Sequence, residues 1–420
     1  MEDFDKFDRS SDEYGGRRDG GSVILSKVSI FLGLGIVGWA CVSSGPDGPQ
    51  IVMEDTSAVS ESLAVASDPY PQKVLVRYSS ITRSFSPAAG HHNDPLDEAV
   101  SALNQGQTLR ALDIIDEIIA RVPPGWQPIS LNQKKNIISY SAWSPEEFEA
   151  FINSGNQGIN VQWVVPSFSR AYFLKSYILV DQKNYEKAMA VIKEGLQLEP
   201  DHPSLLSEAA LVEGRLGQYE KAIELYAKIP QRKWDALPTV AQALRGVGAN
   251  YIKLKKLDEA EVALVKSLAL APCHSGARAG LDKIDAMRGK EAGWEDRDCR
   301  NNLNSLSTVM RGIRLFQKDF LGEDSHFYQK IIMDFAEKSP LVSVNIQQSY
   351  SGSKWISDEG LSRDHKALFL AAYVAGSVEH QVLTGTKGHN HSKGMAKLAE
   401  AYLLYRQDNP PVMALEPNAH

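Results

Sequence analysis

The chain has 420 residues, and at about 150 residues per domain this length predicts two or three structural units. Its 45 basic and 52 acidic residues give a formal net charge of -7, so no overall positive field exists to hold phosphates and nucleic acid is excluded as a main ligand. With 43% hydrophobic residues the chain is not disordered throughout, and its mean hydropathy of -0.28 excludes a polytopic membrane protein while leaving room for one span.

The amino-terminal part of the chain predicts a membrane anchor. Residues 1–21 are polar and rich in glycine, which predicts a disordered cytoplasmic tail. Residues 22–44 follow as a mostly apolar segment, which as a helix would be about 34 Å long, against a hydrocarbon core of about 30 Å. Lys27 lies near the start of this segment, where its side chain can reach the headgroups. We therefore expect one transmembrane helix over residues 22–44.

The charges that flank this segment predict its orientation. Arg17, Arg18 and Lys27 lie on the amino side, whereas only acidic charges follow until Lys73. The positive-inside rule then places the amino terminus in the cytoplasm and the bulk of the chain on the far side, which is the periplasm if the chain is bacterial. A cleaved signal peptide is the open alternative, although the segment before the apolar run is long and acidic rather than short and basic.

A spacer is predicted between the anchor and the folded body. Residues 45–91 contain many Pro, Gly, Ser and Asp residues, a composition typical of a linker. Within it, residues 73–81 alternate enough in polarity to predict one short strand.

Three segments share one helical pattern. In each, an aromatic residue or Leu stands three residues before an Ala, and a large apolar residue follows four residues after that Ala. The residues are Tyr185, Ala188 and Ile192, then Tyr219, Ala222 and Tyr226, then Leu257, Ala260 and Leu264. This pattern resembles the tetratricopeptide repeat, a helix-turn-helix unit of 34 residues in which Ala allows two antiparallel helices to cross closely.

The resemblance implies an all-α fold with a repeat array. The units cover residues 169–202, 203–237 and 241–274, and a capping helix follows, so that the array extends over 169–290. Upstream, residues 92–168 are predicted to hold a degenerate repeat and a helical insert. In that insert, Ser144 and Glu147 have the spacing of a capping box, which predicts a helix over residues 145–153.

The resemblance also implies a binding groove for a protein or peptide partner, lined by the first helix of each repeat. Four of its nine positions are basic and three are large and apolar, which favours an extended partner with acidic and apolar side chains. The alternative that these residues form only a solvated helix face stays open. The nine positions are Arg170, Phe173, Tyr177, Ser207, Leu211, Arg215, Arg245, Ala249 and Lys253.

The carboxy-terminal region, residues 301–407, predicts a helical domain with no recognisable catalytic site and no cofactor. Its helices are expected over residues 303–320, 325–338, 362–383 and 392–407. Three of its histidines could converge on a metal, but no carboxylate or Cys stands at ligand spacing beside them, so a structural role is favoured. These weak candidates are His380, His389 and His391.

Two further features bear on function. Cys273 and Cys299 could form a disulfide around the capping helix if the body of the chain is exported. The segment from Ser351 to Lys354 has the Ser-x-x-Lys spacing of serine-lysine acylases, but the accompanying motifs come in the wrong order, so we interpret it as coincidence.

The sequence thus predicts a single-pass, non-catalytic scaffold or adaptor of a cell-envelope assembly, bound to the membrane through one amino-terminal helix. An enzyme or a metal-binding domain within residues 301–420, with the repeats as a docking arm, is the alternative function.

Overall fold

The computed structural model describes residues 73–79, 84–87, 94–154, 160–229, 237–289, 304–350, 355, 361–388 and 390–409. The predicted tail, the predicted transmembrane helix and most of the predicted linker lie outside these residues, as do Cys299, His389 and the segment from Ser351 to Lys354. The chain divides into two compact units, Met1–Asn250 and Tyr251–His420. Among the described helices, none combines the length and the apolar character that crossing a membrane requires.

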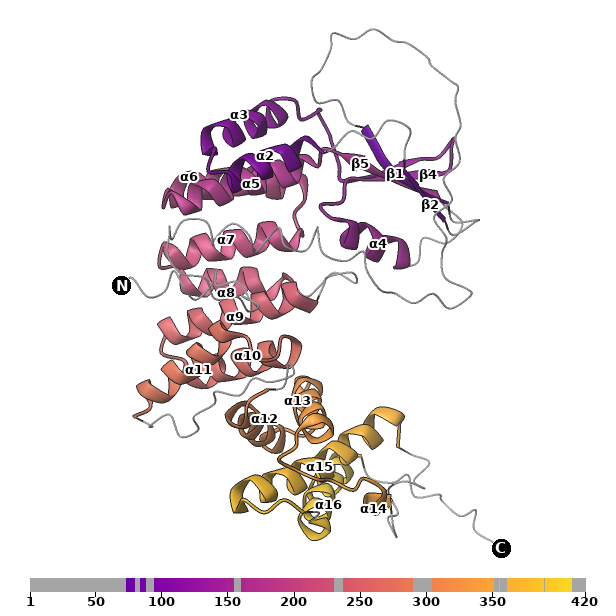
Figure 1. Cartoon of the computed structure of the whole chain (residues 1–420), viewed down its shortest axis with the longest axis vertical. Coiled ribbons are helices and arrows are strands. Elements are labelled where there is room, and N and C mark those ends of the chain that lie inside the picture. The colour runs from indigo at the N-terminus through magenta and orange to yellow at the C-terminus, as the bar shows by residue number, and fades with distance from the viewer. Residues whose placement is uncertain are drawn as a thin grey trace, which may run out of the picture. The chain divides into compact units, whose positions relative to one another are not determined.

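Helical hairpins form most of the first unit (Figure 1). Each second helix packs both on its own first helix and on the first helix of the next hairpin: α3 contacts α2 and α5, and α6 contacts α5 and α7. This alternating contact is how helical repeats stack. The helices are α2 (Pro95–Asn104), α3 (Thr108–Ile119), α5 (Phe168–Asp181), α6 (Tyr185–Leu198), α7 (Pro203–Arg215), α8 (Tyr219–Ala227) and α9 (Leu237–Lys253).

Small residues bring these helices together, as the repeat pattern predicts. Ala188 on α6 and Ala222 on α8 are fully buried. A Cβ atom added to Gly246 on α9 would lie 2.3 Å from the Tyr226 ring of α8, so only glycine leaves room for that ring. The predicted helical-repeat fold is therefore confirmed in this unit.

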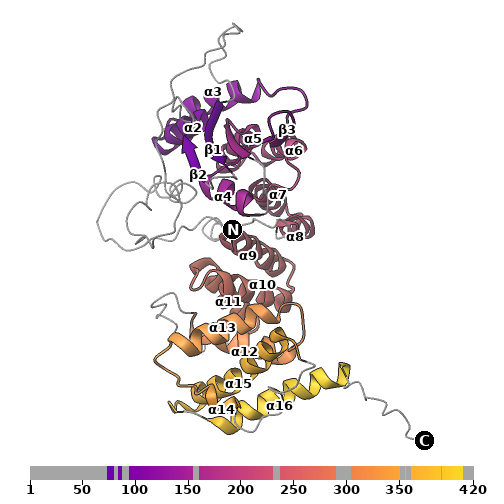
Figure 2. The same cartoon turned by 90° about the vertical axis from the view of Figure 1, so that its right-hand side faces the viewer.

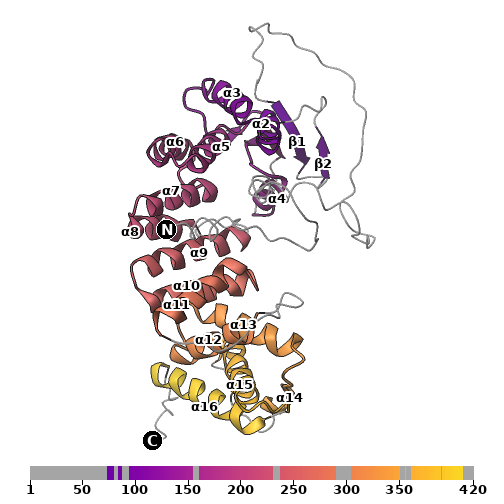
Figure 3. The same ribbon diagram turned by 60° about the vertical axis from the view of Figure 1, so that its left-hand side comes forward.

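A five-stranded sheet lies beside the hairpins of the first unit (Figures 1 and 3). Its strand order is β2-β1-β5-β4-β3, and every pair is antiparallel except β4 with β5. One helix, α4 (Pro145–Asn153), packs on it through Phe148 and Phe151. The strands are β1 (Lys73–Ser79), β2 (Ser84–Pro87), β3 (Ile129–Asn132), β4 (Ile137–Tyr140) and β5 (Asn160–Val165).

The insert is therefore not purely helical, which corrects the prediction for residues 92–168. Helix α4 has the predicted bounds, and the Ser144 side chain accepts a hydrogen bond from the Glu147 backbone N–H, as a capping box requires. The strands β3 and β4 have only four residues each. Strand β5 pairs with β1, which is remote in sequence and lies in the predicted linker. Such short strands, with a distant partner, carry little local signal.

The second unit contains the last part of α9 and a set of helices that share one apolar core (Figure 2). Helix α13 has the predicted bounds, and the ends of α12, α15 and α16 differ from the predicted ones by one to three residues. The short helix α14 was not predicted. The helices are α10 (Leu257–Leu270), α11 (Ser275–Met287), α12 (Leu306–Lys318), α13 (Ser325–Lys338), α14 (Gln347–Tyr350), α15 (Arg363–Thr384) and α16 (His391–Asp408).

Candidate protein-binding face

Five residues that are predicted to bind a partner lie half-exposed on α7 and α9, the first helices of two successive repeats. On α7, Ser207, Leu211 and Arg215 follow at intervals of four residues, so they lie on one face of the helix. On α9, Arg245 and Ala249 repeat this spacing. Helices α7 and α9 lie close together at Gly214 and Asn250. A Cβ atom added to Gly214 would lie only 2.9 Å from Asn250 Oδ1. We call these five residues the first-helix face.

Lys253, the last of the predicted groove positions, is exposed at the end of α9. It belongs to the second unit, which begins at Tyr251. The first-helix face as defined here therefore lies within the first unit.

The predicted groove residues on α5 are engaged within the chain. Arg170 forms ion pairs with Asp94 Oδ2 at 2.8 Å and with Asp97 Oδ1 at 2.9 Å, both contributed by the start of the α2 hairpin. Burial raises the pKa of Asp94, the Arg170 guanidinium lowers it in part, and the net value is about 6. Arg170 thus joins two hairpins rather than presenting its charge to a partner.

Phe173 is covered by a side chain of the insert. It is 7% exposed, and its ring lies 5.3 Å from the ring of Trp143, between centroids. Tyr177, one turn further along α5, is half-buried, with its ring centroid 6.4 Å from that of Phe173. The indole of Trp143 also stacks on His202, with ring centroids 3.5 Å apart and an interplanar angle of 16°. Trp143 therefore covers the first repeat at one of its predicted groove positions.

Glu147 links the insert to the repeats. Its carboxylate accepts hydrogen bonds from the Tyr140 hydroxyl at 2.5 Å and from the Trp143 backbone N–H at 2.8 Å, and its Oε1 lies 3.5 Å from His202 Nε2. Burial raises the pKa of Glu147, but the contacts with His202, Tyr140 and Trp143 outweigh this effect and lower it to about 2. The carboxylate is therefore ionised at neutral pH.

Sequence reasoning found Glu147 and missed the two residues that it brings together. The capping box gave the helix start but carried no information about the surface on which that helix packs. Neither Trp143 nor His202 stands in a motif, although a histidine just before a proline at a helix start is a usable signal. His202 caps α7, its Nδ1 accepting a hydrogen bond from the Ser204 backbone N–H.

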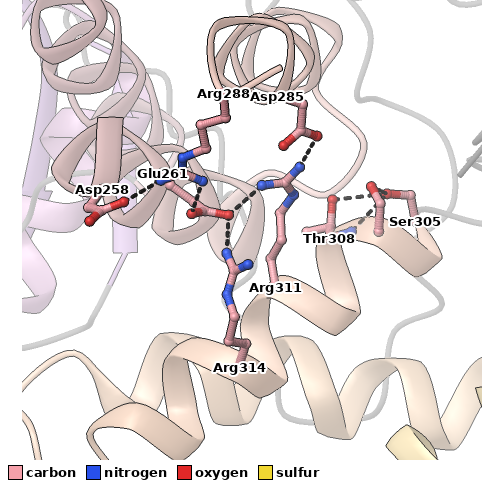
Figure 4. A network of polar contacts seen from close by, with 9 residues as sticks. Asp258, Glu261, Asp285, Arg288, Ser305, Thr308, Arg311 and Arg314 are labelled. Atoms are coloured by element: carbon pink, nitrogen blue, oxygen red, sulfur yellow. Dashed lines mark hydrogen bonds and ion pairs between the residues drawn. The ribbon is translucent and has the colours of Figure 1, made fainter. Parts of the chain in front are cut away.

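A charge network around the buried carboxylate of Glu261 joins three helices of the second unit (Figure 4). Glu261 on α10 accepts hydrogen bonds from Arg288, at the end of α11, and from Arg311 and Arg314 on α12. Burial raises the pKa of Glu261, and the three guanidinium groups outweigh it, so the net shift is downward. Arg288 also pairs with Asp258 and Arg311 with Asp285, which balances three positive charges with three negative ones. This balance fits a structural role better than the binding of an anion.

The predicted metal and disulfide residues are only partly within the described chain. His391 Nδ1 lies 3.2 Å from the Tyr373 hydroxyl, and the His380 carbonyl accepts a hydrogen bond from Thr384. Within the described ranges, no three His, Cys, Asp or Glu residues gather as a metal site would need. Cys273 is disulfide-bonded. Its pairing with Cys299 stays a prediction, because Cys299 lies outside the described residues.

Comparison with known proteins gives a family match on the α5–α6 hairpin. Residues 169–202, which include most of α5 and all of α6, match the family model described as tetratricopeptide repeat. No curated protein matches the sequence.

Solved structures that are similar to this chain include the first tetratricopeptide domain of human RPAP3, with 23% identity, 30% of this chain and 97% of that chain covered, and a TM-score of 0.26. PilF of Pseudomonas aeruginosa has 12% identity, coverages of 59% and 90%, and a TM-score of 0.33. PilW, described as a type IV pilus biogenesis factor, has 15% identity, coverages of 59% and 94%, and a TM-score of 0.35.

The family match coincides with the α5–α6 hairpin, and α6 packs on the next hairpin in the manner of stacked repeats. Residues 169–202 of the chain therefore form a tetratricopeptide repeat.

Proposed function

We propose that this protein is a membrane-tethered, non-catalytic scaffold or adaptor that binds a segment of a partner protein in a cell-envelope assembly. Tetratricopeptide repeats stack into extended surfaces, and binding other proteins is the general use of such surfaces. The tether in this proposal is the apolar segment 22–44, and its orientation follows from the charges that flank it.

The first-helix face is the observation that carries the proposal. Its residues are half-exposed at helical spacing on two adjacent first helices, where a solenoid offers a continuous surface. Arg215 and Arg245 give this face two positive charges, which favour an acidic partner, and Leu211 adds apolar surface between Ser207 and the carboxyl end of α7. The fitting partner is an extended segment with acidic and apolar side chains.

Reversing the charge of this face tests the proposal. The double variant Arg215→Glu and Arg245→Glu, expressed as the full chain and solubilised from membranes, is expected to lose a protein that co-purifies with the wild type, because two attractive contacts become repulsive. A matched control is Lys193→Glu with Lys221→Glu, since both lysines are exposed on second helices and the change in charge is the same. The measurement is quantitative mass spectrometry of the co-purified proteins.

Two further measurements, of helical content and of membrane association, complete this experiment. Circular dichroism must show that both double variants keep the helical content of the wild type. Deleting residues 22–44 is expected to move the protein from the membrane fraction to the soluble fraction. An unchanged set of co-purified proteins in the folded Arg215→Glu, Arg245→Glu variant would refute binding through this face, and a deletion variant that stays in the membrane would refute the tether.

A further inference from the structure

Three residues of the repeats surround the ring of Trp143. His202 at the start of α7 stacks on it, Phe173 on α5 makes a tilted ring contact with it, and Ser169 Oγ accepts a hydrogen bond from its indole N–H at 3.1 Å. These three residues are 7%, 3% and 0% exposed. Trp143 itself is only half-buried, so it closes the site from outside rather than lying in a core.

The polar groups of this site are oriented by contacts within the repeats. The Ser169 hydroxyl donates its proton to Glu199 Oε2 at 2.7 Å, which leaves an oxygen lone pair for an indole N–H. The His202 ring is fixed because its Nδ1 accepts the Ser204 backbone N–H. Neither of these bonds involves Trp143, so both can hold Ser169 and His202 in place when another side chain occupies the site.

Trp143 comes from a different structural module. It lies in the loop between β4 and α4, and its neighbours Tyr140 and Phe148 belong to the apolar cluster of the sheet and α4. The Trp143 side chain instead packs against the apolar cluster of the repeats, which includes Phe173. The loop thus places a single aromatic side chain on a neighbouring surface, as a bound peptide does.

A carboxylate four residues later completes the contact. The Nε2 atom of His202 is buried without a hydrogen-bond partner and faces Glu147 Oε1 at 3.5 Å. Glu147 also accepts the Trp143 backbone N–H, so the tryptophan and the acid are held as one unit at the start of α4. The repeats therefore meet an indole and a carboxylate at a fixed spacing.

We propose that Ser169, Phe173 and His202 form a binding site for a tryptophan side chain, which Trp143 occupies from within the same chain. A partner segment that carries Trp followed by an acidic residue four positions later can replace Trp143 there. This inference rests on the proposed function, because it assigns a second contact point to the same repeat surface, and it specifies the chemistry of the partner. Since Phe173 is a predicted groove position, occupation by Trp143 also closes that position until a partner displaces it.

The test uses the chain's own loop as the probe. A fluorescently labelled peptide with the sequence of residues 141–149 is titrated with the full-length chain in detergent, and binding is measured by fluorescence anisotropy. The variant Trp143→Ala is expected to bind this peptide at least about tenfold more tightly than the wild type, because its site is empty. The same peptide with Ala in place of Trp is expected to bind neither protein.

A second variant covers the case in which Trp143→Ala does not fold. Trp143→Phe keeps an aromatic ring in the site but removes the indole N–H that Ser169 accepts, so it is expected to bind the Trp peptide more tightly than the wild type does. Equal binding by the wild type and a folded variant would overturn the proposal, and so would the absence of binding by both. The assay contains no partner protein, so either result leaves the Arg215→Glu, Arg245→Glu experiment to decide the proposed function separately.

Discussion

At the scale of single residues, Glu147 connects the insert with the repeats. Its backbone N–H bonds to the capping Ser144 of α4, and its carboxylate accepts the Trp143 backbone N–H and faces His202 of the repeats. Its pKa of about 2 is far below the ordinary 4.5, although it is buried, so the groups around it stabilise the ionised form by more than burial destabilises it. The carboxylate therefore stabilises the folded state wherever it is ionised.

Replacing Glu147 tests this account. The pKa falls from 4.5 to about 2 on folding, so the stabilising contribution is present above pH 4.5 and is lost as the pH falls toward 2. We expect Glu147→Gln to lower the free energy of unfolding by about 3 kcal/mol at pH 7, and to have a much smaller effect near pH 2. The measurement is urea unfolding, followed by tryptophan fluorescence, at both pH values.

The exposed neighbour Glu149, on the same helix, provides the control. Glu149→Gln is expected to change stability by less than about 0.5 kcal/mol. If Glu147→Gln destabilised the protein equally at both pH values, the ionised state of the carboxylate would not be the cause.

At this scale, the sequence predicted the local role of a residue better than the residues that it contacts. The spacing of Ser144 and Glu147 predicted a helix start, because a capping box is a local arrangement. The positions of Arg170 and Phe173 predicted groove residues, but whether such a residue is exposed depends on what covers it. Asp94 pairs with Arg170 and Trp143 covers Phe173, and both come from segments that local patterns do not connect to α5.

At the scale of elements, the helices were predicted well, whereas β1 was the one strand of the described sheet that was predicted. The helices follow apolar periodicity and capping signals, which are local in sequence, and α13 has the predicted bounds. The sheet depends on pairing between β1 and β5, with register partners such as Tyr78 and Val161. A strand stabilised mainly by a distant partner leaves only a short alternating pattern in its own sequence.

The Glu261 network gives a prediction for the elements of the second unit. The side chain of Glu261 is 4% exposed and pairs with three arginines, one at the end of α11 and two on α12. Glu261→Gln would leave those guanidinium groups partly buried without their shared carboxylate. We expect a loss of about 3 to 5 kcal/mol in the stability of this unit, measured by chemical unfolding, with faster hydrogen exchange in α11 and α12.

Glu259, exposed on the same helix, is the matched position. Glu259→Gln is expected to leave unfolding and hydrogen exchange nearly unchanged. Faster exchange spread evenly over the whole chain, rather than concentrated in α10 to α12, would contradict the assignment of this network to the contacts between those helices.

At the scale of the whole molecule, the sequence predicts more about architecture than about partners. The repeat spacing predicted stacked hairpins because that spacing is itself a packing rule. The boundary between the two units falls within α9, inside the third predicted repeat, which no composition change marks. A partner's identity leaves no periodic signal, so only its chemistry, acidic and apolar, can be inferred from the residues that would contact it.

The proposed function requires the first-helix face to bind a partner protein. A photo-crosslinking amino acid placed at Ser207, on this face, is compared with one placed at Lys193, exposed on α6. On irradiation in intact membranes, we expect the Ser207 position to yield a defined adduct with one protein and the Lys193 position to yield none. We also expect Arg215→Glu with Arg245→Glu to abolish the adduct. Equal adducts at both positions, or an adduct at Ser207 that survives the charge reversal, would contradict partner binding through the first-helix face.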